Sequence, residues 1–153
     1  MLFRSKCILE AGYSLKDLDA VAVSKGPGSF TGLRIGVASA KGLCYALNLP
    51  LLGIDTLESM ARICKNNLIH SEKTLFCPML DARRMEVYTA LFDQNLNAIE
   101  PVNAQIIDSH SFSNILRNQP VVFFGDGMPK CRDRKSTRLN SSHIPLSRMP
   151  SSA

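Results

Sequence analysis

The stretch SKGPGSFTGLRIGVASAKGL, residues 24–43, joins a glycine-rich turn directly to a run with helical periodicity. The residues just before the turn, AVAVS at 20–24, form an apolar run that predicts a buried strand. Within the turn, Pro27 fixes its own φ and favours extended geometry at Gly26, whereas Gly28 is free to adopt a positive φ. Strand, tight turn and helix in this order predict an α/β protein.

The glycine-rich turn has two interpretations. Ser29 or Thr31 is expected to cap the following helix, and Gly32 allows its first turn to lie close to a neighbour. The same arrangement also offers backbone N–H groups and a helix dipole to a phosphate. Because the spacing matches neither G-x-x-x-x-G-K-[ST] nor G-x-G-x-x-G, we expect a tight corner that positions the helix. A vestigial phosphate site is the alternative, formed by Gly26, Pro27, Gly28, Ser29, Thr31 and Gly32.

The helix expected after the turn carries small residues at Gly32, Gly36 and Ala40, four positions apart. Glycine inside a helix costs up to ~1 kcal/mol relative to alanine, so these positions need a packing reason. Packing within the same lobe and packing against another subunit both satisfy it. We predict an interface helix, with the following contact residues: Gly32, Leu33, Gly36, Val37, Ser39, Ala40 and Leu43.

Strands and helices are also expected along the rest of the chain. PLLGID at 50–55 predicts a second short buried strand, and Thr56 is expected to cap another helix. From residue 73 the pattern predicts two strands around DARR, an N-x-N turn, a third strand at 102–108, a short serine-capped helix and a last strand in VVFFGDG. We therefore expect a first lobe over residues 6–72 and a second over 73–132.

The two ends differ in composition from the rest. Residues 1–5 and 133–153 resemble the translation of a sequencing adapter, and we expect them to be scars outside the fold, with a disordered tail. The whole chain has a net charge of +5, but without these ends it holds thirteen basic and twelve acidic residues. Charge therefore gives no argument for direct binding of nucleic acid.

No apolar run is long enough to cross a bilayer, and we expect a cytoplasmic protein without membrane contact.

Few residues of the sequence are candidates for catalysis or metal binding. His70 and His110 are forty positions apart, the five cysteines contain no C-x-x-C pair, and we predict neither a metal site nor a catalytic residue. In DARR, strand alternation would put Asp81 and Arg83 on one face of the sheet.

Arg84 and Glu86 would then lie on the other face. An ion pair at a hairpin is the expected role of these four residues, with acid–base chemistry or an anion site as the alternative. Asp126 in FFGDG is expected to be a turn residue.

The residues from 22 to 61, AVSKGPGSFTGLRIGVASAKGLCYALNLPLLGIDTLESMA, resemble the signature of the TsaB (YeaZ) family. PMLDARRMEVYTALF and FFGDG are similar to that family in order and distance, so the resemblance covers residues 6–132. It implies an α/β fold of the actin-like, Hsp70-like ATPase (RNase H-like) superfamily with two related lobes. The family's opening strand is missing before Lys6 and the end of its second lobe after Arg132, so both lobes are expected to be truncated.

The resemblance also implies a function. The family supplies a non-catalytic dimerisation or scaffold subunit to the complex that forms N6-threonylcarbamoyladenosine at position 37 of ANN-decoding tRNAs. Its partners would be a TsaD-like catalytic paralogue, a TsaE-like ATPase and a second copy of the chain, with tRNA bound only through the complex. ATP and metal would be used by the partner subunits, and this chain would bind no cofactor alone. An ATP-dependent transferase or metallopeptidase-like enzyme of the same superfamily is the alternative.

Overall fold

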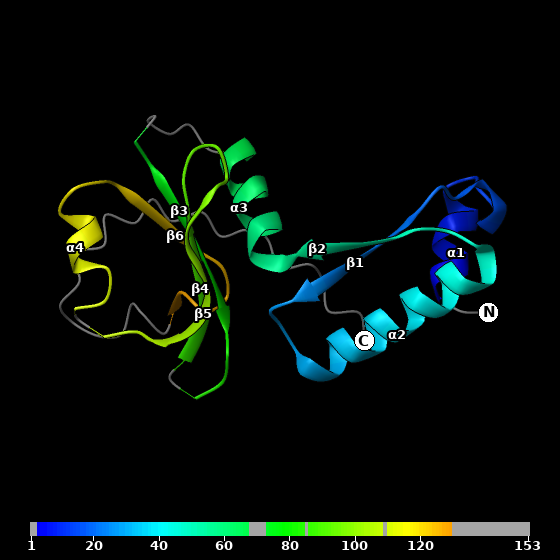
Figure 1. The fold of residues 1–153 in the computed structure, drawn as a ribbon, viewed down its shortest axis with the longest axis horizontal. Helices are drawn as coiled ribbons and strands as arrows, with labels where there is room; N and C mark the ends of the chain where they lie inside the picture. Colours follow the sequence, from blue (N-terminus) through cyan, green and yellow to red (C-terminus); the bar gives the residue numbers. More distant parts are fainter. Residues whose placement is uncertain (1–2, 68–72, 85, 109, 130–153) are drawn as a thin grey trace. The chain divides into compact units, whose positions relative to one another are not determined.

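A computed structural model describes residues 3–67, 73–84, 86–108 and 110–129 (Figure 1). The chain divides into two compact units, Met1–Ile54 and Asp55–Ala153. We expected a boundary near Glu72, but the division falls earlier because the helix that begins at Thr56 packs on strands of the second unit. The assignment of residues to lobes of the related fold stays a prediction. The predicted tail lies outside the described residues, and the first helix already begins at Phe3.

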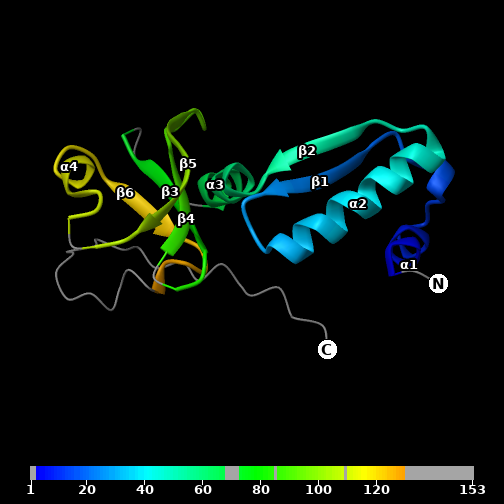
Figure 2. The same ribbon diagram turned by 60° about the horizontal axis from the view of Figure 1, so that its bottom comes forward.

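The first unit is a strand–helix–strand arrangement preceded by a short helix. Its elements are α1 (Phe3–Glu10), the 3-10 helix η1 (Leu15–Asp17), β1 (Val21–Gly26), α2 (Phe30–Leu47) and β2 (Leu51–Asp55). The two strands pair in one sheet and run in the same direction, with α2 alongside them as the crossover helix (Figure 2). Gly12, at φ +81°, ends the turn after α1, where a left-handed glycine commonly follows a helix.

Packing in the first unit is one-sided. Ala40 and Cys44 of α2 are buried, and a Cβ added at Gly36 would lie 3.8 Å from Cγ2 of Val23 on β1. The prediction of two buried strands is wrong for much of their length, since Leu52 and Ile54 are 49% and 44% exposed. The reason is that α2 packs on one face of a sheet that has two strands in the described part of the chain.

The second unit is a four-stranded mixed sheet with helices on its faces. Its elements are α3 (Thr56–Asn67), β3 (Leu75–Asp81), β4 (Glu86–Phe92), β5 (Ala98–Ile106), α4 (Ser113–Leu116) and β6 (Val121–Phe124). The strand order is β5-β4-β3-β6, with β4 antiparallel to both neighbours and β6 parallel to β3 (Figure 1). The two strands predicted around DARR and the strand predicted in VVFFGDG are confirmed.

Two apolar clusters cover the two faces of this sheet. Successive residues of β3, such as Phe76 and Cys77, belong to different clusters, because successive side chains of a strand point to opposite faces. One cluster contains Leu57, Ala61 and Cys64 of α3. The other is flanked by α4 and by Phe112, the residue before it, whose ring lies edge-on to Phe123 with ring centroids 5.3 Å apart. A strand buried on both faces is expected to be continuously apolar, as β3 is.

The edge strand β5 is much less covered. Ile99, Val102 and Ile106 are exposed, and the register against β4 shifts between Thr89 and Phe92. Pro101 in the middle of β5 has no N–H to offer to a further strand.

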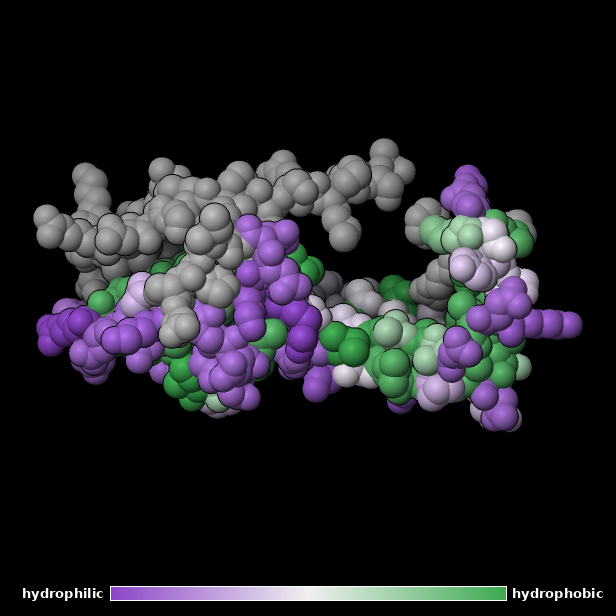
Figure 3. Space-filling model, turned by 90° about the horizontal axis from the view of Figure 1, so that it is seen from above, coloured by the Kyte–Doolittle hydropathy of each residue, from purple (hydrophilic) through white to green (hydrophobic). Residues whose placement is uncertain are grey.

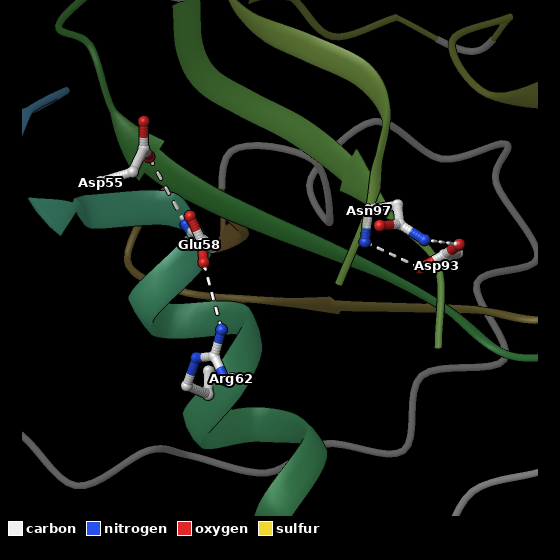
Figure 4. Close-up of polar contacts among 5 residues, drawn as sticks. All are labelled: Asp55, Glu58, Arg62, Asp93 and Asn97. Atoms are coloured by element: carbon white, nitrogen blue, oxygen red, sulfur yellow. Dashed lines mark hydrogen bonds and ion pairs between the residues drawn. The ribbon is translucent and has the colours of Figure 1, made fainter. Parts of the chain in front are cut away.

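The cap of α3 differs from the prediction. Asp55 rather than Thr56 caps this helix, since its Oδ1 accepts a hydrogen bond from the N–H of Leu57 at 3.1 Å. It also accepts one from the N–H of Glu58 at 3.5 Å (Figure 4). The carboxylate precedes the first helical residue, and from this position it reaches the free donors of the first turn.

The predicted serine cap of α4 is also wrong. The residue before α4 is Phe112, which makes no side-chain cap. Ser111 instead accepts the N–H of Asp108 at 2.9 Å, within the loop before α4.

The predicted N-x-N turn between β4 and β5 is confirmed. Asp93 accepts the backbone N–H of Asn97 at 2.8 Å and its side-chain amide at 2.9 Å (Figure 4). These hydrogen bonds, the side-chain one first, lower the pKa of the Asp93 carboxyl. The carboxylate and the backbone hydrogen bond from the N–H of Asp93 to the carbonyl of Asn97 (3.0 Å) together fix the start of β5.

We expect Gly125→Ala to destabilise the chain strongly. Gly125 has φ +107°, and a Cβ there would overlap the carbonyl oxygen of Met79 and lie 2.9 Å from Cε of Met60. The free energy of unfolding, measured by urea denaturation, should fall by about 2–4 kcal/mol. Gly42→Ala is the control, because its Cβ would have nothing within 4 Å and alanine favours the helix. Equal stability of the two variants would contradict this prediction.

Candidate functional site

The glycine-rich turn between β1 and α2 has the geometry of a helix cap. Ser29 is the residue before α2, and its Oγ accepts the N–H of Gly32 at 3.4 Å while its carbonyl accepts that of Leu33 at 2.8 Å. Thr31 is already inside the helix and exposed, so of the two predicted caps Ser29 is the correct one. A Cβ added at Gly32 would lie 3.5 Å from the side chain of Ser29 and would meet no other element within 4 Å, contrary to the expected close approach.

The positive φ of the turn is at Gly26 and not, as predicted, at Gly28. Gly26 has φ +110°, is buried, and precedes a cis peptide bond to Pro27. A Cβ at Gly26 would lie 3.2 Å from Cδ1 of Leu33, whereas at Gly28 the same distance is 3.9 Å. The side chain of Leu33 therefore leaves little room for a Cβ at Gly26 and ordinary room for one at Gly28.

The donors of the turn are partly used within the protein. The N–H of Gly26 is bonded to Oγ of Ser24 at 3.4 Å, and the N–H of Gly32 is bonded to Ser29. A phosphate held by backbone groups would compete with both bonds. The geometry thus favours the interpretation as a corner that positions α2.

The small-residue stripe of α2 lies largely on the face that packs inside the unit. Gly36 faces Val23 of β1, and Ala40 is buried. Leu33 and Val37 share this face by helical spacing and are half-buried. Ser39, Leu43 and Gly32 lie toward its flank. Internal packing therefore occupies much of the surface that we expected to contact a partner, and an interface role for these residues stays a prediction.

The opposite face of α2 carries a second stripe that the sequence analysis missed. It consists of exposed residues spaced by four, three, four and three positions: Thr31, Ile35, Ala38, Gly42 and Tyr45. Ile35 is 59% exposed and Tyr45 93%. We call these five residues the outer seam. The signal was visible in the sequence, because a 4-3 spacing of small and apolar residues is typical of helices that pack against another helix.

The DARR segment forms a tight turn between β3 and β4. Arg83 and Arg84 have φ values of +69° and +48°, so the expected alternation of strand faces is wrong from Arg83 onward. A left-handed backbone costs roughly 1–2 kcal/mol for a residue with a Cβ. We call these two residues the arginine turn.

Two carboxylates hold the backbone of the arginine turn and of the strand end before it. Oδ1 of Asp81 accepts the N–H of Arg83 at 2.7 Å, and Oδ1 of Asp126 accepts the N–H of Asp81 at 3.1 Å. The N–H of Gly127 donates to the carbonyl of Met79 at 3.0 Å. Asp126 is thus a turn residue, as predicted, and the FFGDG loop holds the end of β3 next to the arginine turn.

Histidines and metal-ligating groups form no cluster in the part of the chain that the structure describes. His110 is exposed and its backbone N–H donates to Asp108 at 2.9 Å, while His70 lies outside the described residues. Hydrogen bonds, first that from the Ser111 side chain, lower the pKa of Asp108. Among the described residues, no group of three potential ligands comes together, and no helix is long and apolar enough to cross a membrane.

Three of the described cysteines are buried, and Cys7 is exposed. Burial raises the pKa of the Cys64 thiol to about 11, which keeps it protonated at neutral pH. The thiol of Cys44 donates to the carbonyl of Pro50 at 3.6 Å. These thiols act as packing groups.

We expect Gly26→Ala and Gly28→Ala to differ although they are two residues apart. Alanine at Gly26 combines a positive φ with a Cβ 3.2 Å from Leu33, and should lower the free energy of unfolding by about 1–3 kcal/mol. Alanine at Gly28 meets only ordinary contacts and should change it by less than about 0.5 kcal/mol. Thermal or urea denaturation of both variants tests the difference, and the reverse order would refute the assignment of the strained position.

Comparison with known proteins gives a consistent family. Residues 2–133 match the family described as tRNA N6-adenosine threonylcarbamoyltransferase (TsaD). The chain is 37% identical over 116 residues to the tRNA threonylcarbamoyladenosine biosynthesis protein TsaB of Bacillus subtilis, covering 72% of this chain and 47% of that protein. It is 42% identical over 91 residues to TsaB of Escherichia coli, covering 58% and 37%. The chain therefore spans about half or less of these relatives.

A solved structure shows the same fold. The crystal structure of an uncharacterised protein from Pseudomonas aeruginosa with similarity to peptidase YeaZ matches with a TM-score of 0.66 at 23% identity, over 89% of this chain and 62% of that one. Together with the family match over residues 2–133, this mixed α/β fold fits an actin-like, RNase H-like fold, as the resemblance in the sequence implied. Fold, glycine turn and relatives together place the chain in the TsaB (YeaZ) family, within the wider family of tRNA threonylcarbamoyltransferases.

Proposed function

We propose that this chain is a non-catalytic partner subunit in the synthesis of N6-threonylcarbamoyladenosine at position 37 of ANN-decoding tRNAs. The names of the related proteins support the pathway. The observation that carries the role as a partner subunit is the outer seam of α2, which runs along the helix face opposite to the packed one.

The outer seam has the properties of a helix–helix contact. Ala38 and Gly42 are small and exposed, and a Cβ at Gly42 would meet nothing within 4 Å, so another helix can approach closely there. Ile35 and Tyr45 add large apolar surface on either side of these small positions. A 4-3 spacing keeps such residues on one line along a helix of 18 residues.

Exposed apolar side chains are concentrated in the first unit. Of the large hydrophobic residues that are exposed among the described ones, seven of eleven belong to it: Leu9, Tyr13, Phe30, Ile35, Tyr45, Leu52 and Ile54. In Figure 3, green surface predominates over the part of the molecule on the right, which holds this unit. Surfaces of this kind commonly mark contacts with other proteins.

A TsaD-like catalytic paralogue is the partner that we assign to the outer seam. A paralogue of the same fold can present an equivalent helix, so that two related seams pack together, and a second copy of this chain offers the same surface in a homodimer. In this proposal the TsaE-like ATPase joins the assembly, and ATP, metal and tRNA are handled through the partner subunits.

We expect Ala38→Glu to weaken capture of the TsaD-like protein from the same genome by at least about tenfold. The substitution places a carboxylate without a partner in the centre of the buried seam. Co-expression followed by affinity capture and quantification of the two proteins measures this effect.

Lys41→Glu is the matched control. It introduces the same side chain on the flank of α2 and should leave capture within about twofold of the unmodified chain, because rim charges contribute little. Undiminished capture by the Ala38→Glu variant would remove the outer seam as the interface. Circular dichroism of both variants verifies that α2 is retained.

A further inference from the structure

The arginine turn has a backbone that packing does not explain. Five described residues other than glycine have a positive φ: Asn48, Arg83, Arg84, Leu96 and Phe112. Asn48 is the residue after α2, where a left-handed conformation commonly ends a helix. Leu96 and Phe112 are apolar and pack against the two clusters of the second unit.

Neither explanation applies to Arg83 and Arg84, which do not end a helix as Asn48 does and do not pack against an apolar cluster as Leu96 and Phe112 do. They follow a strand rather than a helix, and both side chains are exposed. Within the described part of the chain, neither guanidinium has an ion pair, and the only ring that an arginine covers there is that of Phe30, by Arg34. Asparagine and glycine adopt this conformation at lower cost, so the fold alone gives no reason for two consecutive arginines.

The turn is nevertheless held firmly. Asp81 and Asp126 bond to the backbone N–H groups of Arg83 and Asp81, and Gly125 and Gly127 lie too close to β3 for any side chain. Two cationic groups are thus presented from a fixed backbone. An observed strained backbone with exposed functional groups is a reason to look for a ligand.

We infer that Arg83 and Arg84 bind phosphate groups of the tRNA backbone when the chain is part of its complex. The inference rests on the proposed function. Guanidinium groups donate two parallel hydrogen bonds to phosphate oxygens and keep their charge at all relevant pH values.

One feature of the turn favours RNA over a protein partner. No large apolar side chain is exposed among the described residues 81–84 and 125–127, whereas the centre of a protein interface usually contains one. A phosphate contact needs no such anchor. Because Asp81 and Asp126 carry negative charge next to the turn, attraction over a long range is small. The arginines are therefore expected to act by direct contact with one or two phosphates.

The test replaces the two arginines with the residues that the backbone prefers. Binding of an unmodified tRNA transcript with an ANN anticodon is titrated with the complex of this chain and its TsaD-like partner, between about 0.05 and 0.2 M salt. For Arg83→Asn/Arg84→Gly we expect affinity to fall roughly tenfold per lost contact, and the slope of log K against log salt to become shallower by about one per contact. An Arg83→Lys/Arg84→Lys variant should keep most of the slope, since the charges remain.

Arg117→Asn serves as the control. Arg117 is exposed at the end of α4 in the same unit, and its replacement should change neither affinity nor slope. The Asn–Gly variant should melt at the same temperature as the unmodified chain or higher, because it relieves the strained backbone. A lower melting temperature would mean that the arginines stabilise the turn, and this result would count against the inference.

Three results separate the inference from the proposed function. An unchanged affinity and slope in the Asn–Gly variant, with the complex intact, overturns the phosphate contact but leaves the proposed function standing. Loss of capture of the TsaD-like protein by the Arg83→Asn/Arg84→Gly variant also overturns it, because the turn is then a protein contact. If even the unmodified chain fails to capture that protein, the proposed function fails. The chain alone is then titrated with the same tRNA at low salt, where a shallower slope for the variant supports the inference and equal slopes overturn it.

Discussion

The backbone hydrogen bonds on both edges of β3 are the constraint on which the second unit depends. β3 pairs with β4 through the shortest hairpin of the chain and with β6 across more than forty residues of sequence. Because β3 is bonded on both edges, its side chains alternate between two apolar clusters, one under α3 and one beside α4. The end of β3 is in turn where the FFGDG loop meets the arginine turn. A shift of β3 by one residue would exchange the clusters and displace this turn.

Local signals in the sequence predicted the elements well and their environments less well. The β3–β4 hairpin, the Asp93–Asn97 turn and the Ser29 cap all follow from residues close together in sequence. Whether a strand is buried depends instead on what covers it, so Leu52 was predicted inside and is half exposed. An apolar run of five residues does not reveal that its sheet has only two strands in the structure.

The errors at the candidate sites have a common physical origin. Gly26 and Gly28 are equally permissive as residues, and only the position of Leu33 decides which of them needs to lack a Cβ. Asp55 and Thr56 are both good caps, and the start of α3 selects the first. Residue propensities could not predict the arginine turn. Arginine strongly prefers a negative φ, whereas Arg83 and Arg84 both have a positive φ. Departures of this kind are expected at functional positions.

The two faces of α2 limit how its sequence can change. On the inner face, Ala40 and Cys44 are buried, so larger residues would not fit there. On the outer face, the outer seam from Thr31 to Tyr45 requires small or apolar residues at a fixed spacing. Only the flanks, with Arg34 and Lys41 on one side, lie outside both surfaces. A saturation mutagenesis profile of this helix should therefore show two periodic bands of intolerance, half a turn out of phase, separated by narrow tolerant flanks.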